Sequence, residues 1–319
     1  MSNTIIRPSS RQEWLKLREA GIGSSDVGTI LGLNPYETPY QLWRRKMGID
    51  PPIAENFAMK AGHYLEDAVS LFYRDETGKE LIKRSAGDWL IVNDDKPYLR
   101  VSPDRTYWLP DRPKSERNKG ILECKTTQKE IEKESVPQHW FCQLQYQLGV
   151  AEYEQGALAW LTMGRTFDYM EYNYDHEFFK WMVEEVERFW LDNIVGKKEP
   201  MVLNVDDVLL RSPRHVLGKN VEATEELVEA CTELKELKEE LSSMEGRKKE
   251  LENQIKMAMD DAEALIAPDS PRSKPIILAT WKAAKDSVKF NEKKFAAENP
   301  ELYQSYQFTQ AGSRRFLLK

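Results

Sequence analysis

The chain has few of the residues that build disulfide frameworks or zinc sites. Its 319 residues include three cysteines and four histidines, and none of them forms a metal-like cluster or spacing. A secreted disulfide scaffold and a zinc centre are therefore excluded as organising features. The low cysteine content favours a reducing, cytoplasmic setting.

Long apolar runs are also missing. No stretch approaches the roughly 18 residues that a membrane-spanning helix needs. The segment from Met1 to Ser10 lacks the apolar core of a signal peptide. A content of 40% hydrophobic and 31% charged residues is typical of a globular protein, so no membrane partner is expected.

An overall basic charge, which would favour nucleic acid, is absent too, because 46 basic residues face 53 acidic ones and the net charge is −7. This charge is unevenly distributed. Residues 221–262 hold thirteen acidic and six basic residues, whereas residues 271–319 hold ten basic and four acidic ones. Segregation of this kind is compatible with a basic surface for a polyanion.

Helix and strand patterns alternate over about the first 200 residues. Helices are expected near residues 10–20, 24–32, 39–48, 55–77, 137–150 and 178–195. Strands are expected near residues 81, 89–92, 98–101, 105–109, 120–125, 157–162 and 168–173, those from 81 to 125 forming one antiparallel stretch. The pattern predicts an α/β or α+β core with a central mixed sheet flanked by helices.

The remaining residues predict an extension of different character. Apolar residues recur at three- and four-residue steps over 221–262, which indicates one long amphipathic helix or a helical hairpin turning at Gly246. Residues 276–319 suggest a small β-α-β unit that ends in a strand at 314–318. The predicted domains are a core over 1–218, a long helix over 219–265 and a small basic unit over 266–319.

The most informative motif is Ser102-Pro103-Asp104, followed nineteen residues after Asp104 by Glu123-Cys124-Lys125. On a strand, Glu123 and Lys125 share a face. Together with Glu66, Asp104 and the backbone carbonyl of Cys124, they offer oxygen ligands that suit Mg²⁺ or Mn²⁺, next to an ammonium. This combination is typical of metal-dependent phosphodiester hydrolysis. The alternative is a turn aspartate and an exposed Glu–Lys pair.

Two further groups allow a functional and a structural interpretation. Ser24 and Ser25 open a short helix near Arg18, which predicts either an anion site or ordinary helix capping. Gln143, Tyr146 and Gln147 share a helix face, where they either hold a phosphate or a water or form a polar stripe.

Five motifs stand in register over about residues 14–150 and resemble the lambda-type phage exonuclease family, also called YqaJ-type viral recombinases. They are Trp14-Leu15-Lys16-Leu17-Arg18 with Gly21-Ile22-Gly23-Ser24-Ser25-Asp26, Ala58-Met59-Lys60-Ala61-Gly62 with Glu66, Ser102-Pro103-Asp104, Glu123-Cys124-Lys125 and Gln143-Leu144-Gln145-Tyr146.

The resemblance implies a restriction-endonuclease-like core and Mg²⁺-dependent 5′→3′ digestion of one strand of linear duplex DNA. This digestion would leave 3′ single-stranded tails for phage-type recombination. The resemblance also implies ring-shaped trimers that act on DNA ends with a single-strand annealing protein, encoded by a phage or prophage and located in the bacterial cytoplasm. The alternatives are an endonuclease of the same fold and a DNA-end-binding protein acting through the C-terminal extension.

The same resemblance assigns residue roles. Glu66, Asp104 and Glu123 would be metal ligands, and Lys125 would hold the nucleophilic water. Support for the metal and phosphate would come from Gln143 and Tyr146. The 5′ phosphate would be held by Arg18 and Ser25.

One expected feature is missing from this pattern. The best-known relatives carry a second arginine in the loop after the serine helix, but residues 32–40 contain none. Arg45, or Arg44 beside it, is the substitute that the sequence suggests.

Overall fold

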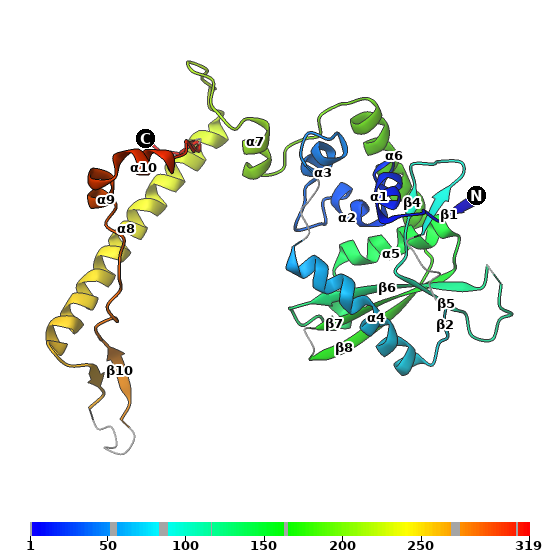
Figure 1. Ribbon diagram of the computed structural model, residues 1–319, viewed down its shortest axis with the longest axis horizontal. Coiled ribbons are helices and arrows are strands. Elements are labelled where there is room, and N and C mark those ends of the chain that lie inside the picture. Colours follow the sequence, from blue (N-terminus) through cyan, green and yellow to red (C-terminus); the bar gives the residue numbers. More distant parts are fainter. Residues whose placement is uncertain are drawn as a thin grey trace. The chain divides into compact units, whose positions relative to one another are not determined.

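The computed structural model describes residues 2–51, 56–82, 89–115, 117–162, 165–268, 275–310 and 312–319 of the chain. The chain divides into two compact units, Met1–Arg211 and Ser212–Lys319 (Figure 1). The predicted domain limits at 218 and 265 stay predictions.

The first unit is built on a five-stranded sheet with the order β2-β5-β6-β7-β8. Its strands are β2 (Leu81–Ile82), β5 (Arg105–Trp108), β6 (Lys119–Thr127), β7 (Gln155–Thr162) and β8 (Thr166–Asn173). The pair β6 and β7 is parallel, whereas the other neighbouring pairs are antiparallel. A parallel pair needs a crossover, which helix α5 (Gln138–Ala151) supplies. The predicted α/β fold class with a helix-flanked mixed sheet is confirmed.

Helices cover both faces of this sheet, as Figure 1 shows for α4 (Phe57–Thr77) and α5. Leu122 and Cys124 of β6 pack in a core with Val69 and Tyr73 of α4. Ile121 belongs instead to the larger core that includes the apolar residues of α5. Because side chains alternate along a strand, the odd-numbered residues of β6 face α5 and the even-numbered ones face α4.

Three short helices and a small sheet precede and flank this core. They are α1 (Arg11–Glu19), α2 (Ser24–Ile30), α3 (Pro39–Lys46), β1 (Asn3–Ile6), β3 (Leu90–Asn93) and β4 (Arg100–Val101). The hydroxyl of Ser10 accepts from the backbone of Glu13 and begins α1, and Thr38 and Gln41 form a capping box at the start of α3. The unit ends with α6 (His176–Arg188), a π-helical turn over Phe189–Val195 and α7 (Val205–Arg211).

One sheet prediction is wrong. The strands expected at 89–92 and 98–101 do not join the antiparallel stretch that ends at β6. They form a separate three-stranded sheet in the order β1-β3-β4. The physical reason is the N-terminal strand β1, which pairs with β3 from Asn3 opposite Asn93 to Ile6 opposite Leu90 and was not expected from the sequence.

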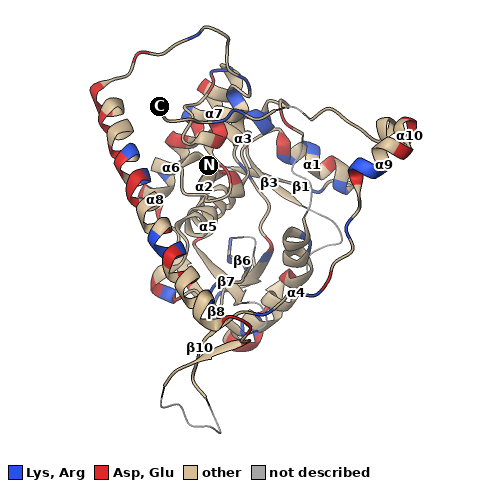
Figure 2. Ribbon diagram, turned by 90° about the vertical axis from the view of Figure 1, so that its left-hand side faces the viewer, with Lys and Arg blue, Asp and Glu red and all other residues tan. Residues whose placement is uncertain are grey.

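The second unit contains the predicted long helix as one element, α8 (Glu225–Met259), which the hydroxyl of Thr224 caps. Figure 2 shows both signs of charge along this helix, and all of its residues are described. Of these only Met259 is buried. Neither α8 nor any other helix of the described residues is long and apolar enough to cross a membrane.

Of the two forms predicted for residues 221–262, the structure contains the single long helix. It does not turn at Gly246, because a single glycine costs a helix interior only about 1 kcal/mol. One prediction for the extension is wrong. The last 44 residues do not form a β-α-β unit, since residues 314–318 are not a strand. The described elements are a hairpin of β9 (Ala264–Ile266) and β10 (Ile277–Thr280), then α9 (Glu292–Glu298) and α10 (Pro300–Ser305).

Candidate functional site

Asp104 lies in the turn between β4 and β5, directly beside β6. Its Oδ2 accepts a hydrogen bond from the backbone N–H of Cys124 at 2.8 Å, and the hydroxyl of Ser102 anchors the same turn on the carbonyl of Trp89 at 2.7 Å. Burial raises the pKa of the Asp104 carboxyl well above its usual range, and the charges of Glu123 and Glu66 raise it further. The shift indicates mutual repulsion between three neighbouring carboxylates.

Glu123 is almost fully buried, with 2% of its surface exposed, and points toward α5. Its Oε1 accepts from Nζ of Lys125 at 2.8 Å and from Nε2 of Gln143 at 2.5 Å. Its Oε2 accepts from Nε2 of Gln147 at 2.8 Å. The two glutamines are one helical turn apart on α5 and together fix the orientation of the carboxylate.

Lys125 lies on the same face of β6 as Glu123, as the sequence predicted. Besides the Glu123 contact, its ammonium donates to Oε1 of Gln143 at 2.7 Å. Burial alone would lower the pKa of Lys125, but the charges of Glu123 and Asp104 outweigh it and raise the pKa. Lys125 therefore stays an ammonium that can hold a water or a phosphate oxygen, rather than a neutral amine that takes a proton.

Glu66 reaches the site from α4, on the other side of the sheet from Glu123. Its Oε1 lies 3.4 Å from Nδ1 of His63 and its Oε2 lies 3.8 Å from a terminal nitrogen of Arg105. Glu66, His63 and Asp104 line the same pocket. No role was assigned to His63 from the sequence, although its spacing of three residues from Glu66 on a helix places both on one face.

These side chains fit a hard divalent cation by donor chemistry and by charge. The candidate donors are oxygen atoms, which Mg²⁺ and Mn²⁺ prefer, and a cation would relieve the repulsion around Asp104. They do not form a closed ligand set: within the described ranges, no three His, Cys, Asp or Glu side chains are grouped closely enough for a ready-made metal site. The metal thus stays a prediction of this donor set.

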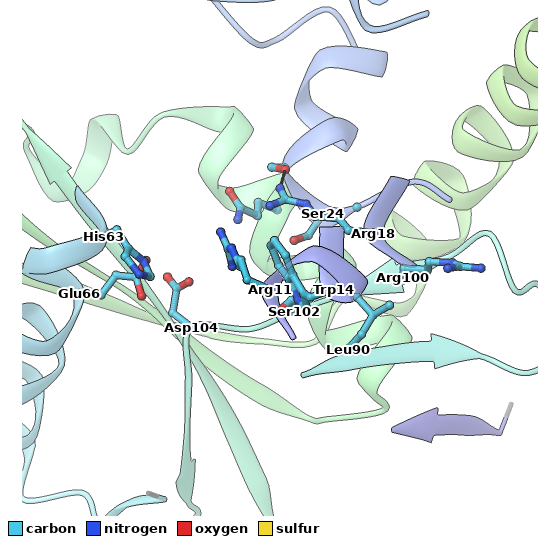
Figure 3. Close-up of a pocket in the computed structure, with 13 residues that line it drawn as sticks. Arg11, Trp14, Arg18, Ser24, His63, Glu66, Leu90, Arg100, Ser102 and Asp104 are labelled. Atoms are coloured by element: carbon cyan, nitrogen blue, oxygen red, sulfur yellow. Dashed lines mark hydrogen bonds and ion pairs between the residues drawn. The ribbon is translucent and has the colours of Figure 1, made fainter. Parts of the chain in front are cut away.

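A pocket of about 150 Å³ opens beside the carboxylates, and Figure 3 shows its two sides. Glu66 and Asp104 lie on the acidic side. The other side is lined by cationic and hydroxyl side chains, those of Arg11, Arg18, Arg100, Ser24, Ser25 and Ser102. Acidic and basic groups at one pocket suit a molecule that carries phosphates along its length.

Arg18 and Ser25 meet in this pocket, where Nη2 of Arg18 donates to the hydroxyl of Ser25 at 2.7 Å. Ser24 is buried and accepts from Nε2 of Gln147 at 3.1 Å. Since Gln147 also donates to Glu123, it connects the serine pair to the carboxylate cluster. The sequence placed Gln147 on the helix face of Gln143, but it did not predict the contact of Gln147 with Glu123.

The arginines suggested as substitutes lie in ion pairs instead. Nε of Arg45 lies 2.9 Å from Glu37, and its Nη2 lies 3.3 Å from Asp26. Arg44 makes a two-pronged contact with Asp50, both nitrogens at 2.7 Å. Neither arginine lines the pocket, whereas Arg11 and Arg100 do.

Tyr146 lies apart from the polar cluster. It is fully buried, and its hydroxyl donates to the carbonyl of Ile22 at 3.2 Å. Burial raises the pKa of Tyr146 well above its usual range, and the charge of Asp26 adds to the shift, so the phenol stays protonated. The role suggested for it at the metal stays a prediction.

Asp26 supports a prediction about acid stability. Burial alone would raise its pKa, but the charges of Lys46, Arg45 and Arg18 outweigh it and lower the pKa to about 2 from 3.8. A carboxyl with a depressed folded-state pKa stabilises the fold above the unfolded pKa, and this contribution is lost as the pH falls through the folded value. We expect Asp26→Asn to cost about 2 kcal/mol at pH 7.

The measurement is thermal unfolding between about pH 7 and pH 2, with the exposed Asp95→Asn as control. The gap between wild type and Asp26→Asn should close between about pH 4 and pH 2. A gap that stays constant over this range would mean that the carboxylate charge does not stabilise the fold.

Comparisons with known proteins place the chain in a family. A YqaJ-like viral recombinase domain matches residues 13–154. The structure resembles an alkaline exonuclease from Laribacter hongkongensis, with a TM-score of 0.43, 16% identity, and coverage of 58% of this chain and 93% of that one. It also resembles a phage-related exonuclease from Haemophilus somnus 129PT, with a TM-score of 0.39, 12% identity, and coverage of 58% and 99%.

A full-length relative decides the assignment. The Bacillus subtilis (strain 168) protein described as "Uncharacterized protein YqaJ" is 30% identical over 323 residues, which cover 97% of this chain and 94% of that protein. The resemblance inferred from the motifs is therefore confirmed, and the chain belongs to the YqaJ-like viral recombinase family.

Proposed function

We propose that this protein is a metal-dependent exonuclease that digests one strand of linear duplex DNA from the 5′ end. Such digestion leaves 3′ single-stranded tails for recombination by strand annealing. The observation that supports the proposal is the pair of buried Glu123 and partly buried Lys125 beside Asp104, which lies next to a pocket with acidic and basic sides.

The proposed metal is Mg²⁺, with Mn²⁺ as a substitute, held by Glu66, Asp104, Glu123 and the carbonyl of Cys124. When bound, the ion polarises a phosphodiester and lowers the pKa of a coordinated water. The named side chains supply the negative charge that a divalent cation needs, since the charges of Glu123 and Glu66 raise the pKa of Asp104.

The other polar residues position the reacting groups. Lys125 is held as an ammonium between Glu123 and Gln143, where it can hold the attacking water and stabilise developing negative charge. Gln143 and Gln147 keep the Glu123 carboxylate in one orientation. Because three donors share its two oxygens, Glu123 cannot turn away without leaving buried polar groups unpaired.

The basic side of the pocket supports digestion of the DNA strand from its 5′ end. Arg18, Ser24 and Ser25 would hold the terminal 5′ phosphate, and Glu66 and Asp104 would face a phosphodiester further along the same strand. A site that binds the terminal phosphate places a bond near the strand end at the carboxylates. This arrangement favours exonuclease over endonuclease cleavage.

The assembly and setting are part of the same proposal. We infer ring-shaped trimers acting on duplex ends with a single-strand annealing protein in the bacterial cytoplasm. Family membership supports these inferences, and light scattering of the purified protein tests the trimer.

Digestion of end-labelled DNA tests the activity. We expect linear duplex to be shortened from its 5′ ends in Mg²⁺ or Mn²⁺, and not in EDTA, because the carboxylate cluster needs a cation to act. Covalently closed circular duplex should stay intact. Nicking of the circle would support an endonuclease, and digestion in EDTA would contradict the metal-dependent site.

A further inference from the structure

Helix α8 carries a regular apolar seam along its length. When Leu227 is taken as the first position of a seven-residue repeat abcdefg, the pattern runs without interruption to the last turn of the helix. The a positions are Leu227, Leu234, Leu241, Lys248 and Ile255. The d positions are Ala230, Leu237, Met244, Leu251 and Ala258. Apolar residues at all of these positions except Lys248 are typical of the contact seam of a coiled coil.

The seam is open to solvent. All of its residues are exposed, and the seven large apolar side chains among them have between 36% and 66% of their surface exposed. An apolar stripe of this length costs free energy in water, and most of the stability of a helix normally comes from packing such a stripe against another element. The seam is therefore a surface for docking.

The charges of α8 indicate what docks there. Residues 225–241 hold seven acidic and two basic residues, whereas residues 242–259 hold three acidic and four basic ones (Figure 2). When two α8 helices lie antiparallel, the acidic half of each lies along the more basic half of the other. A parallel pair would place the two acidic halves together, which is unfavourable. The charges thus favour a second copy of this chain in the antiparallel orientation.

The seam also defines a register for the antiparallel pair. Because one helix is reversed, a positions of one copy face d positions of the other. When Leu241 lies opposite Met244 of the second copy, every a position meets a d position, out to Leu227 opposite Ala258. No seam residue is left without a partner in this register.

Lys248, the polar residue of the seam, favours the same orientation. In a parallel pair equal positions meet, so the two copies of Lys248 would face each other. In the antiparallel register Lys248 lies opposite Leu237 of the second copy, where Glu233 and Glu240 flank that leucine at g positions and can accept from the ammonium. Within its own helix Lys248 lies 3.8 Å from Glu252, and such an exposed contact contributes little.

The flanking e and g positions carry matching charges in this register. Lys238 faces Glu245 of the second copy at e positions, and Glu240 faces Arg247 of the second copy at g positions. Twofold symmetry repeats both pairs, and no e or g position of α8 faces a like charge on the second helix. A parallel pair would instead place Glu240 opposite Glu245. Arg247 also contacts Glu250 of its own helix at 2.9 Å, with both side chains exposed to a partner.

We propose that α8 is a self-association site, at which two copies of the chain pair in an antiparallel coiled coil. This inference goes beyond the proposed nuclease function and does not depend on it. An antiparallel pair is twofold symmetric, so it does not close a ring of three subunits. It would join two of the proposed rings to each other.

The mass of the full-length protein in solution tests the pairing, with light scattering as the measurement. Leu241→Glu places a charge at the centre of the seam and should halve the mass of the assembly, whatever number of subunits other contacts hold together. Ser243→Glu adds the same charge at an exposed c position, away from the seam, and should keep the wild-type mass.

A charge reversal tests the orientation. In the antiparallel register Glu245→Lys places a lysine opposite Lys238 of the second copy, so association should weaken several-fold. Adding Lys238→Glu to this variant restores the opposite charges and should restore association. In a parallel pair Glu245→Lys would face Glu240 and strengthen association instead. The measurement is the protein concentration at which half of the pairs dissociate.

Thiol cross-linking tests the register. Cys231 is an exposed cysteine at an e position, and in the antiparallel register it faces Glu252 of the second copy. A short bismaleimide should therefore link Glu252→Cys into a covalent dimer. Residues 231 and 252 lie about 30 Å apart along one helix, so the reagent cannot join them within a chain. Glu250→Cys, an exposed c position, is the control and should not be linked.

A mass that Leu241→Glu leaves unchanged would overturn the inference, because the seam would then be covered within one chain or by a different protein. Tighter association of Glu245→Lys would overturn the antiparallel orientation. Equal linking of the two cysteine variants, or none at residue 252, would overturn the register. The nuclease proposal fails separately, if wild type with Mg²⁺ or Mn²⁺ leaves linear duplex intact, because none of these measurements contains DNA.

Discussion

Replacing Asp104 by Asn should lower the rate of DNA digestion about a thousandfold, which corresponds to ~4 kcal/mol of barrier. The substitution removes one negative charge from the proposed ligand set. It keeps the shape of the side chain and the oxygen that accepts the N–H of Cys124. The measurement is the initial digestion rate of a linear duplex in Mg²⁺.

The same substitution should not destabilise the metal-free protein. The pKa of Asp104 is raised by burial, Glu123 and Glu66, and a carboxyl with a raised folded-state pKa destabilises the fold once it is ionised. In EDTA, Asp104→Asn should therefore melt at or above the temperature of wild type. Its advantage should grow as the pH rises, because the wild-type carboxyl ionises further.

Metal binding supplies a third readout. A ligand that binds the folded state raises the melting temperature, so Mg²⁺ should stabilise wild type and should stabilise Asp104→Asn much less. The exposed Asp206→Asn is the matched control and should behave as wild type in all three measurements. Loss of activity together with a lower melting temperature in EDTA would show that Asp104 supports the fold rather than a metal.

The second large effect is expected at Lys125. Lys125→Met keeps most of the length of the side chain, removes its charge, and should lower the digestion rate by about 10²–10³-fold. It should also destabilise the protein by about 3 kcal/mol, because Glu123 stays buried without its cation. Exposed Lys129→Met, four residues further along the chain, is the control.

A double variant separates these two losses. In Glu123→Gln with Lys125→Met no buried charge is left unpaired, so much of the lost stability should return. The activity should not return, since the proposed ligand and the ammonium are both gone. Recovery of digestion in the double variant would contradict a catalytic role for the pair and leave it only a structural one.

Local spacing was enough to predict a large part of this site. The alternation of side chains on β6 put Glu123 and Lys125 on one face, where the structure joins them at 2.8 Å. Helix patterns placed α1, α3, α4 and α5, and apolar periodicity placed α8. These features depend on residues close together in the chain, so a short window of sequence contains them.

Contacts between segments that are far apart in the sequence could not be predicted from a short stretch of residues. β3 pairs with β1 near the N-terminus and therefore does not belong to the sheet that the sequence predicted for it. Gln147 reaches Glu123 because α5 crosses between two parallel strands. Arg44 and Arg45 looked available, but the fold brings Asp50, Glu37 and Asp26 to them.

The sequence by itself determined the family motifs, the carboxylate–lysine pair and the helix-flanked sheet that holds it. Those features depend on the spacing of residues along one strand or helix, and this spacing does not depend on tertiary contacts. Only the tertiary structure decided which charged side chains are paired with one another. It paired Arg45 with Asp26 and Glu37, because neutralisation depends on which residues meet across the fold.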